Sequence, residues 1–371
     1  MIKTTLRTRF DADIGTPPDL APHPATVVDV SSPARLHLGF LDPSASLGRR
    51  FASLGLVLDG FATRLRLQFA EGDSDPAGAT ATGLGHGLHQ RIRIDECCSG
   101  DAAERMARYL AALQRESGLA QPLQVVLSAM PPAHSGFGSG TQLALALGRA
   151  FCTLHGLDWS TRRIATVLGR GERSGVGIAG FDQGGLLLDG GPGPDGATAP
   201  LLARIAFPVD WRVVLVLDDR IDGLSGSAER VAMDRLQPFP REFAADLCHQ
   251  VLMRVLPGAI ERRFEPFAAG VSAIQRLIGD YFAPAQGGSM YTGAAVARVV
   301  EWIGSHYAAG IGQSSWGPTG FAFLRSADEA AGAIAAARAA GVVDPALRLV
   351  VMGANNRGAR VEVATAALAR A

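Results

Sequence analysis

From residue 26 onward, apolar and polar side chains alternate over short stretches, the two-residue period of strands that bury one face. The stretches TVVDVSS, ARLHLGF, LGLVLDG and ATRLRLQF follow one another, and in the last of them Leu65, Leu67 and Phe69 alternate with polar residues. Turn residues separate these stretches. The pattern therefore predicts a half-buried antiparallel sheet at the start of the ordered chain.

A helical period appears after residue 100. A helix is predicted over 101–117, followed by the strand LQVVLSAM, a glycine-rich loop, an alanine-leucine helix and another helix from about residue 160. Residues 71–90 are rich in Gly, Asp and Ala without any period, so we expect a long hairpin connection or an insertion there.

The second half of the chain opens with one more short strand, GGLLLDGG, after which GPGPDGATAP interrupts the pattern. Strands are then predicted at RIAF, WRVVLVLD, FAFLR and LRLVVMG, and helices over 241–256, 265–281, 294–307 and 327–341. Strands around paired helices favour an α+β sandwich over a doubly wound parallel sheet. We expect a loosely ordered tail over 1–25, one domain over 26–199 and a second domain over 200–371.

The amino-acid composition argues against some kinds of binding partner. The chain has 371 residues, 47% of them hydrophobic, and 35 basic residues balance 35 acidic ones. This balance provides no overall field for nucleic acid or an anionic membrane. No apolar run is long enough to cross a bilayer, and the first 25 residues contain no signal-peptide core. The four cysteines lack zinc or disulfide spacing, so we expect free thiols in the cytoplasm.

The segment PPAHSGFGSGTQLALALGRAF, residues 131–151, carries the clearest chemistry. Its glycines allow positive φ and a close approach of backbone N–H groups to a ligand, and a helix starting at about Gly140 adds its dipole. These features predict a phosphate site; a glycine turn that only caps a buried helix is the alternative. The loop is neither a Walker A sequence nor a Rossmann fingerprint. The expected ligand contacts are Ser135, Gly136, Gly138, Ser139, Gly140, Thr141 and Gln142.

This loop resembles the second motif of the GHMP kinase superfamily, which holds the triphosphate of ATP. The segment SGVGIAGFDQGG is similar to the part of these kinases that carries a catalytic aspartate, but Gly177 stands at the matching position. A glycine cannot orient or deprotonate a substrate hydroxyl. The resemblance implies that the kinase scaffold is kept while phosphoryl transfer is lost.

Five segments together resemble a non-kinase branch of this superfamily, the β-ribofuranosylaminobenzene 5'-phosphate synthases, also described as β-ribofuranosylphenol phosphate synthases of methanopterin biosynthesis. They are SPARLHLGFLD, GRRFASLGLVLDG, HSGFGSGTQLALALG, GRGERSGVGIAGFDQGGLLLDGG and GIGQSSWGPTGFAF. The resemblance implies a GHMP-kinase-like α+β fold, with an N-terminal domain like ribosomal protein S5 and a C-terminal ferredoxin-like sandwich.

The same resemblance implies a decarboxylating phosphoribosyltransferase. Ribose 5-phosphate would pass from phosphoribosyl pyrophosphate to 4-aminobenzoate or 4-hydroxybenzoate, with release of CO₂ and pyrophosphate, early in tetrahydromethanopterin biosynthesis. Mg²⁺ is the expected cofactor, without assigned ligands, and a homodimer is left open. A small-molecule kinase using ATP and a non-catalytic protein that binds a phosphate ligand are the alternatives.

Further candidates lie outside the loop. Arg35 and His37 are two residues apart in one predicted strand, with Gly39 clearing space beside them, and are expected to be catalytic; ordinary strand residues are the alternative. Arg49 and Arg50 could form a mobile anion clamp or a solvated pair.

The remaining candidates lie at predicted turns. Arg170 and Arg173 are expected to converge on a phosphate, or else to complement a helix dipole. Asp182 is expected to be catalytic and to bind the ribose hydroxyls or a metal; a loop cap is the alternative. In GQSSWGPTG, the place of the third superfamily motif, Ser314 and Ser315 are expected to donate to phosphate oxygens. Trp316 is expected to show a ring face to the benzoate; a core tryptophan anchoring a turn is the alternative.

Overall fold

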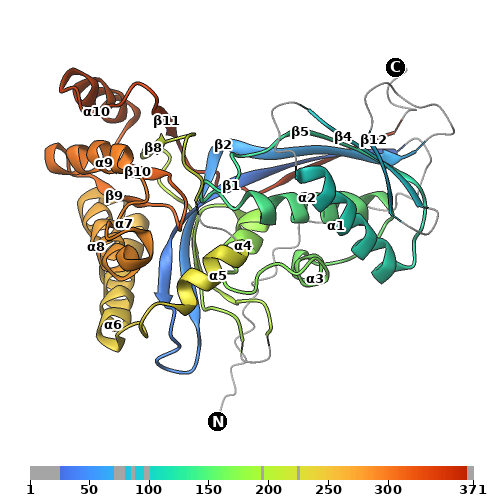
Figure 1. Ribbon diagram of the computed structural model, residues 1–371, viewed down its shortest axis with the longest axis horizontal. Coiled ribbons are helices and arrows are strands. Elements are labelled where there is room, and N and C mark those ends of the chain that lie inside the picture. Colours follow the sequence, from blue (N-terminus) through green and yellow to red (C-terminus); the bar gives the residue numbers. More distant parts are fainter. Residues whose placement is uncertain are drawn as a thin grey trace, which may run out of the picture.

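Two β-sheets, each flanked by helices, make up the protein (Figure 1). The computed structural model describes residues 26–70, 80–84, 88–95, 101–193, 196–223 and 226–365. The predicted α+β class is confirmed, since the described strands are almost all antiparallel and the helices pack on the sheets. The predictions for the tail and for most of residues 71–90 lie outside the described residues.

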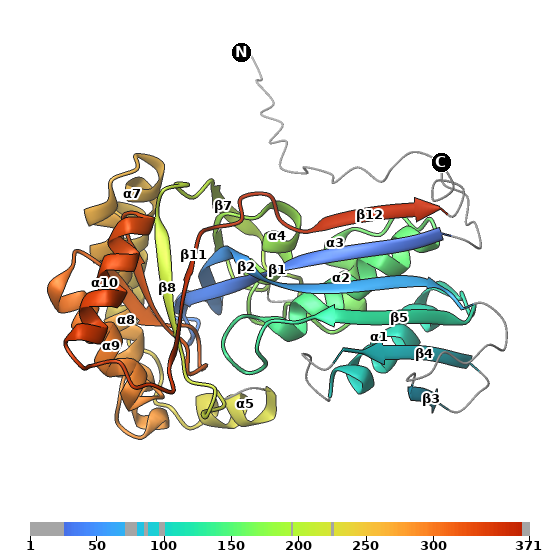
Figure 2. The ribbon, with the colours of Figure 1, turned by 90° about the horizontal axis from the view of Figure 1, so that it is seen from above.

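Two long strands run from one half of the molecule into the other, as Figure 2 shows. They are β1 (Thr26–Asp42) and β2 (Phe51–Phe69), and each joins two of the strands predicted from the sequence. The pairing register between them shifts between Pro33 and Arg35 and again between His37 and Gly39. These irregularities bend the strands and re-aim side chains at the level of the candidate site.

The first sheet has the order β12-β1-β2-β5-β4-β3, with β6 added to β2 and β7 added to β6. All its pairs are antiparallel except β4 with β5, which α1 (Ala102–Ser117) connects. Four helices, α1 to α4, lie on one face of this sheet (Figure 1). The bounds are β3 (Thr80–Leu84), β4 (Leu88–Ile94), β5 (Leu123–Ala129), β6 (Leu186–Asp189), β7 (Leu201–Ile205), β12 (Arg360–Thr365), α2 (Ser139–Leu154), α3 (Thr161–Val167) and α4 (Val176–Gln183).

The second sheet has the order β11-β8-β10-β9, all antiparallel. Its strands follow the chain order β8, β9, β10, β11 with helices after the first and third, which is the ferredoxin-like arrangement predicted from the resemblance. The bounds are β8 (Arg212–Leu217), β9 (Gly310–Gln313), β10 (Gly320–Leu324), β11 (Arg348–Met352), α8 (Phe264–Phe282), α9 (Ala294–His306) and α10 (Ala327–Ala339).

Further helices precede α8. They are α5 (Gly226–Asp234), α6 (Arg241–Gln250), a π-helical turn (Val251–Val255) and α7 (Leu256–Ile260), and a short 3-10 turn follows α8 (Ala283–Gln286). The helix predicted over 241–256 is thus interrupted by the π-helical turn, and α5 was not predicted from the sequence.

Strands from both sides of the predicted domain boundary at residue 199 belong to the first sheet. β7 pairs with β6, and β12, the last described strand, returns to pair with β1 in the first sheet. The division into 26–199 and 200–371 stays a prediction about independent units.

Apolar packing joins the halves through the long strands. The N-terminal part of β1 and the C-terminal part of β2 pack on α1 and α2, through residues such as Val28 and Leu67. The C-terminal part of β1 and the N-terminal part of β2, with Leu36 and Leu56, belong to one cluster with β8, β10 and α8. The site described below lies where the two parts meet.

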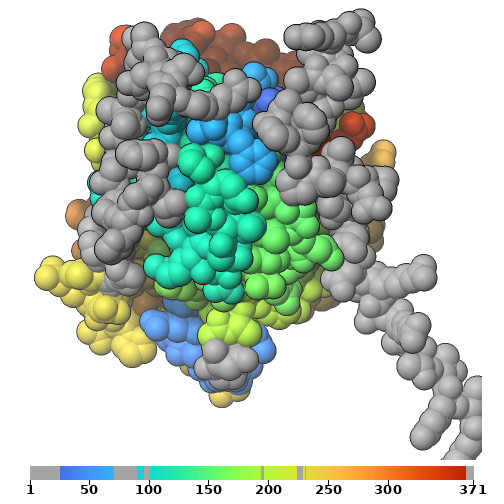
Figure 3. All heavy atoms as spheres, turned by 90° about the vertical axis from the view of Figure 1, so that its right-hand side faces the viewer, coloured from blue at the N-terminus to red at the C-terminus, as the bar shows by residue number. Residues whose placement is uncertain are grey.

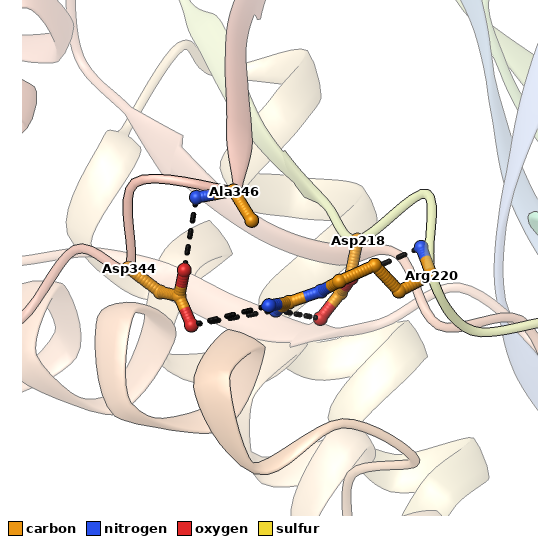
Figure 4. A network of polar contacts seen from close by, with 4 residues as sticks. All are labelled: Asp218, Arg220, Asp344 and Ala346. Atoms are coloured by element: carbon orange, nitrogen blue, oxygen red, sulfur yellow. Dashed lines mark hydrogen bonds and ion pairs between the residues drawn. The ribbon is translucent and has the colours of Figure 1, made fainter.

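Polar contacts fix the outer ends of the helices and strands. At the end of β8, Asp218 accepts two hydrogen bonds from the Arg220 guanidinium, both 2.7 Å, and Asp344 before β11 approaches the same guanidinium (Figure 4). On another face, teal and green segments, the colours of α1 and α3, fill the centre of the view in Figure 3. Arg163 on α3 lies 3.5 Å from Glu116 on α1. None of the described helices is both long and apolar enough to span a membrane.

Candidate active site

The glycine-rich loop leads directly into α2, whose N-terminus carries no protein cap. The N-cap is Gly138 with φ 70°, no side chain accepts from the first turn, and that turn holds no acidic residue. The first N–H groups of a helix lack partners within it, and its dipole is positive at this end. The start of α2 is therefore suited to an anion, and the phosphate site there stays a prediction.

Two arginines stand beside this helix start. A Cβ placed on Gly140 would be 3.6 Å from a guanidinium nitrogen of both Arg105 and Arg170. Arg170 Nη2 also donates to Thr141 Oγ1 over 3.2 Å, whereas Arg105 is paired with Asp101. Arg170 thus lies where the sequence predicted, and Arg105 is an addition that the sequence reasoning missed.

Arg35, on β1, forms hydrogen bonds to backbone carbonyls of the loop. Its backbone N–H donates to the Phe137 carbonyl over 3.1 Å, and Nη1 donates to the Gly136 carbonyl over 2.9 Å. A Cβ on Gly138 would lie 2.9 Å from the Arg35 guanidinium carbon, so only glycine allows this approach. Burial lowers the pKa of Arg35 to about 10, and the neighbouring Arg170 and Arg173 act in the same direction.

A second turn, residues 314–319, packs against the loop. Ser314 Oγ donates to the Gly136 carbonyl over 2.9 Å and accepts the His37 N–H over 3.1 Å, which ties the turn, the loop and β1 together. A Cβ on Gly317 would lie 2.5 Å from the Gly136 nitrogen. Ser315 has φ 53°. The turn therefore lies beside the phosphate loop, but both contacts of Ser314 are with the protein, where the sequence predicted donation to phosphate oxygens.

His37 is a buried imidazole beside the arginines. It is only 2% exposed, and neither ring nitrogen has a hydrogen-bond partner among the described residues. Burial, followed by the charges of Arg35 and Arg173, holds its pKa well below the ordinary value. The ring meets Phe40 edge-on at 4.6 Å between centroids. His37 is therefore neutral, with unused hydrogen-bonding capacity.

Arg173 is bound by a carboxylate that the sequence reasoning missed. Both oxygens of Glu229, on α5, lie 2.8 Å from the terminal nitrogens of Arg173. Glu229 is 8% exposed, and its charge also acts on Arg35. The two residues are 56 positions apart, so no local spacing could have indicated the pair.

Asp189, at the end of β6, is a second missed residue. One oxygen accepts the N–H groups of Ser53 and Gly191, and the other accepts those of Gly175 and Val176 together with the Ser174 hydroxyl. Burial raises its pKa, although these bonds oppose that effect. This carboxylate fixes the start of α4 and is saturated by protein donors.

Gly177, which stands where the resembling kinases carry a catalytic aspartate, faces the start of α2. A Cβ there would lie 3.1 Å from the Thr141 methyl carbon. Its carbonyl accepts from Gln142 Nε2 over 3.0 Å, and the Gln142 side-chain oxygen accepts from Ser32. Gln142 is thus buried, and both its amide nitrogen and its amide oxygen bond to the protein between β1, α2 and α4, where the sequence predicted a ligand contact.

Several predicted residues are not brought to the loop. Asp182 accepts a hydrogen bond from Thr161 at the start of α3, and its catalytic role stays a prediction without a geometric basis. Arg49 donates to the Gly191 carbonyl and Arg50 to the Pro43 carbonyl at the tip of the β1–β2 hairpin. Both arginines are exposed there, as in the alternative of a solvated pair.

The aromatic and glycine predictions also need correction. Trp316 is 2% exposed and packs on Phe282 at 4.4 Å between centroids, so its ring is not presented to a ligand. A Cβ on Gly39 would lie 2.1 Å from Ile278 Cδ1, because α8 packs closely on β1 at this point. The space beside Arg35 and His37 is therefore filled by α8.

The residues present fit Mg²⁺ only as a companion of a phosphorylated ligand. Among the described residues, no group of three or more His, Cys, Asp or Glu is placed to hold a metal ion. Mg²⁺ is commonly bound by one or two protein oxygens, waters and substrate phosphates. The hydroxyls of Ser139 and Thr141, in the first turn of α2, are oxygen ligands of the required kind.

Comparison with solved structures identifies proteins that share this fold. A homoserine kinase from Cytophaga hutchinsonii aligns with a TM-score of 0.60 and 17% identity over 91% of this chain and 97% of its own. A mevalonate diphosphate decarboxylase from Staphylococcus aureus aligns with a TM-score of 0.61 and 14% identity over 91% and 98%. These likenesses establish a shared fold.

Comparison with families and curated sequences is more specific. Residues 102–190 match the GHMP kinases N terminal domain, and residues 255–343 match GHMP kinases C terminal. The beta-ribofuranosylphenol 5'-phosphate synthase of Archaeoglobus fulgidus is 33% identical over 90% of this chain and 98% of its own length. The enzyme of that name from Methanothermobacter thermautotrophicus is 30% identical over 89% and 97%. The resemblance inferred from the motifs is confirmed, and the chain belongs to the beta-ribofuranosylphenol 5'-phosphate synthase family.

Proposed function

We propose that this protein joins ribose 5-phosphate from phosphoribosyl pyrophosphate to 4-hydroxybenzoate or 4-aminobenzoate, with loss of CO₂ and pyrophosphate, early in tetrahydromethanopterin biosynthesis. The observation that carries the proposal is the uncapped start of α2, with the arginines Arg35, Arg170 and Arg173 around it and no carboxylate at position 177. The free cysteines Cys152 and Cys248 accord with a cytoplasmic reaction.

The reaction needs an anion site more than it needs a base. The bond from C1 of the ribose to the pyrophosphate oxygen breaks, and the electron pair leaves with pyrophosphate. The ring carbon that bears the carboxylate then bonds to C1, and the pair from the breaking bond to the carboxyl carbon restores the aromatic ring as CO₂ departs. No proton is removed from the ring, so the chief demand is stabilisation of the leaving pyrophosphate.

The arginines and the start of α2 suit that demand. Charge-assisted bonds from guanidinium groups to phosphate oxygens are strong and are often bidentate. Side-chain nitrogens of both Arg35 and Arg170 are buried without a partner among the described residues, so capacity remains for a ligand. Mg²⁺ held by Ser139, Thr141 and the phosphates would supply further positive charge to the leaving group.

A neutral His37 is compatible with the positive charge that develops on the ribose. An imidazolium so close to Arg35 and Arg173 would add a further cation to the site, and burial together with these arginines prevents it. The neutral ring can still donate one hydrogen bond and accept another. We assign His37 to hydrogen bonding with the substrates.

The competing activity is phosphoryl transfer from ATP. Kinases of this fold rely on a carboxylate near the transferred phosphoryl group, and the structure has only Gly177 facing Thr141 at the matching position. Introduction of a side chain there would press on the first turn of α2.

Both activities are tested in one experiment. The protein is incubated with Mg²⁺, phosphoribosyl pyrophosphate and each benzoate, and pyrophosphate is quantified; a parallel incubation contains ATP and sugar alcohols, and ADP is quantified. The proposal expects pyrophosphate release that depends on the benzoate, and no ADP. ADP formation without benzoate-dependent pyrophosphate would establish the kinase instead.

A further inference from the structure

One carboxylate lies among the arginines of the candidate site. Glu229 is nearly buried and meets Arg173 in a two-pronged ion pair, with both oxygen-to-nitrogen distances 2.8 Å. This is the geometry in which a guanidinium binds a carboxylate or a phosphate. The side chain of Arg173 remains one-third exposed, so it is reachable from solvent.

The charges around Glu229 do not cancel. Arg170 and Arg173 act on Arg35 as like charges, and the carboxylates that act on Arg35 are those of Glu229 and Asp189. Asp189 is already saturated by five protein donors. The arginines therefore retain an excess of positive charge after Glu229 is counted, and buried nitrogens of Arg35, Arg170 and His37 lack partners among the described residues.

Both partners of the ion pair are placed by elements of the site. Arg173 comes just before the start of α4, which Asp189 holds. On the other side, the chain that leads to α5 is fixed on the phosphate loop, because the Gly223 N–H donates to the His134 carbonyl over 3.1 Å. A Cβ on Gly223 would also lie 2.5 Å from the Gly317 Cα. Gly223 is thus held against the loop that is expected to bind phosphates, and Glu229, on the helix that follows in the chain, pairs with Arg173.

We propose that Glu229 occupies, in the substrate-free protein, the position of a phosphate group of the substrate on Arg173, and that the phosphorylated substrate replaces it there. The inference rests on the proposed function for the identity of that substrate. Its consequence is that every binding event must break the Glu229–Arg173 pair, which weakens the apparent affinity for any phosphorylated ligand.

The test is binding of inorganic pyrophosphate, measured by calorimetry with EDTA present so that no metal contributes. Glu229→Gln removes the competing charge with little change in shape, and Glu242→Gln, at an exposed glutamate in the first turn of α6, is the matched control. We expect Glu229→Gln to bind pyrophosphate about tenfold more tightly than the wild type, an effect of the size of one charge-assisted bond, while Glu242→Gln binds as the wild type does.

A second comparison excludes a merely structural effect. In an Arg173→Gln background, Glu229→Gln has no ion pair to release, so its effect on affinity should shrink to the part that comes from the Glu229 charge acting on Arg35. Thermal unfolding of each variant checks that all of them are folded. Equal or weaker binding by folded Glu229→Gln overturns the inference and leaves the proposed function standing. If no variant binds pyrophosphate with EDTA, the same titrations are repeated with Mg²⁺, and absence of binding under both conditions overturns the anion site itself, and the proposed function with it.

Discussion

At the scale of residues, contacts that only glycine permits build the site. Gly136, Gly138 and Gly317 lie where the phosphate loop, β1 and the 314–319 turn meet, and a Cβ on any of them would come within 3.0 Å of a neighbouring atom. Two of them, Gly136 and Gly138, also have positive φ. A larger residue would displace backbone at Gly136 and Gly317, and the Arg35 guanidinium at Gly138.

The first prediction concerns Gly136→Ala, with Gly118→Ala as its control. Both glycines have φ between 70° and 80°, but a Cβ on Gly136 would lie 2.3 Å from the Ser314 carbonyl oxygen whereas one on Gly118 meets nothing within 4 Å. Gly118→Ala is expected to lose roughly 1 kcal/mol of unfolding free energy from backbone strain alone. Gly136→Ala is expected to lose about 2–4 kcal/mol and most of its activity. Urea unfolding and turnover assays check this; similar losses in both variants would refute the contact.

The second prediction follows from the lowered pKa of His37. Because the unfolded chain protonates this histidine near pH 6.5 and the folded protein keeps it neutral, stability is present above that pH and is lost as the pH falls below it. His37→Gln should therefore lose less unfolding free energy than the wild type between pH 7.5 and 5.5, by about 1 kcal/mol. Urea unfolding at both pH values measures the difference. Parallel losses would mean that His37 protonates in the folded state.

At the scale of elements, the start of α2 is the feature that the sequence predicted best. The glycines, the absence of a capping side chain and the following apolar helix are all local, and local patterns report helix starts well. The partners across the fold could not be predicted in this way. Glu229 reaches Arg173 from a helix 56 residues away, and Trp316 and Gly39 pack against α8 for reasons that only the tertiary structure reveals.

The third prediction tests this helix start with Ser139→Asp. A carboxylate in the first turn is favourable for the helix dipole, so unfolding free energy should stay the same or rise by up to about 1 kcal/mol. It would, however, repel the pyrophosphate of the substrate, and activity should fall by more than a hundredfold. Ser139→Asn, which is similar in shape without the charge, is expected to keep much more activity. A folded Ser139→Asp with normal turnover would contradict the loop assignment.

At the scale of the whole molecule, β1 and β2 connect the two halves of the structure. The last described strand, β12, pairs with β1 at the edge of the first sheet. The strands were predictable from their alternation. The continuity of β1 through Pro33 and the pairing of β12 with β1, however, depend on long-range contacts. The resemblance to a known family provided the ferredoxin-like order that alternation alone could not.

The fourth prediction concerns the Asp218–Arg220–Asp344 network that fixes the end of β8 (Figure 4). Hydrogen bonds from Arg220 lower the pKa of the buried Asp218, so its stabilisation is present above the unfolded pKa of about 3.9 and is lost as the pH falls through the lowered folded pKa. Asp218→Asn should cost about 1–3 kcal/mol of unfolding free energy at pH 7, and this difference should shrink below pH 4.

Asp219→Asn provides the control for that measurement. Asp219 is an exposed neighbour that pairs with Arg348 over 3.3 Å, and such surface pairs contribute less than about 1 kcal/mol. Urea unfolding across the pH range compares the two variants. Equal costs, or a cost for Asp218→Asn that does not change with pH, would show that the buried carboxylate is not the acid-sensitive group.

The central claim is that this fold uses its phosphate loop for decarboxylating phosphoribosyl transfer. The most direct test is incubation with Mg²⁺, phosphoribosyl pyrophosphate and 4-hydroxybenzoate or 4-aminobenzoate labelled at the carboxyl carbon, with labelled CO₂ collected over time. We predict release of one CO₂ for each pyrophosphate formed, with at least one of the two acids, and none when phosphoribosyl pyrophosphate is replaced by ATP. A folded protein that releases no labelled CO₂ from either acid would contradict the claim.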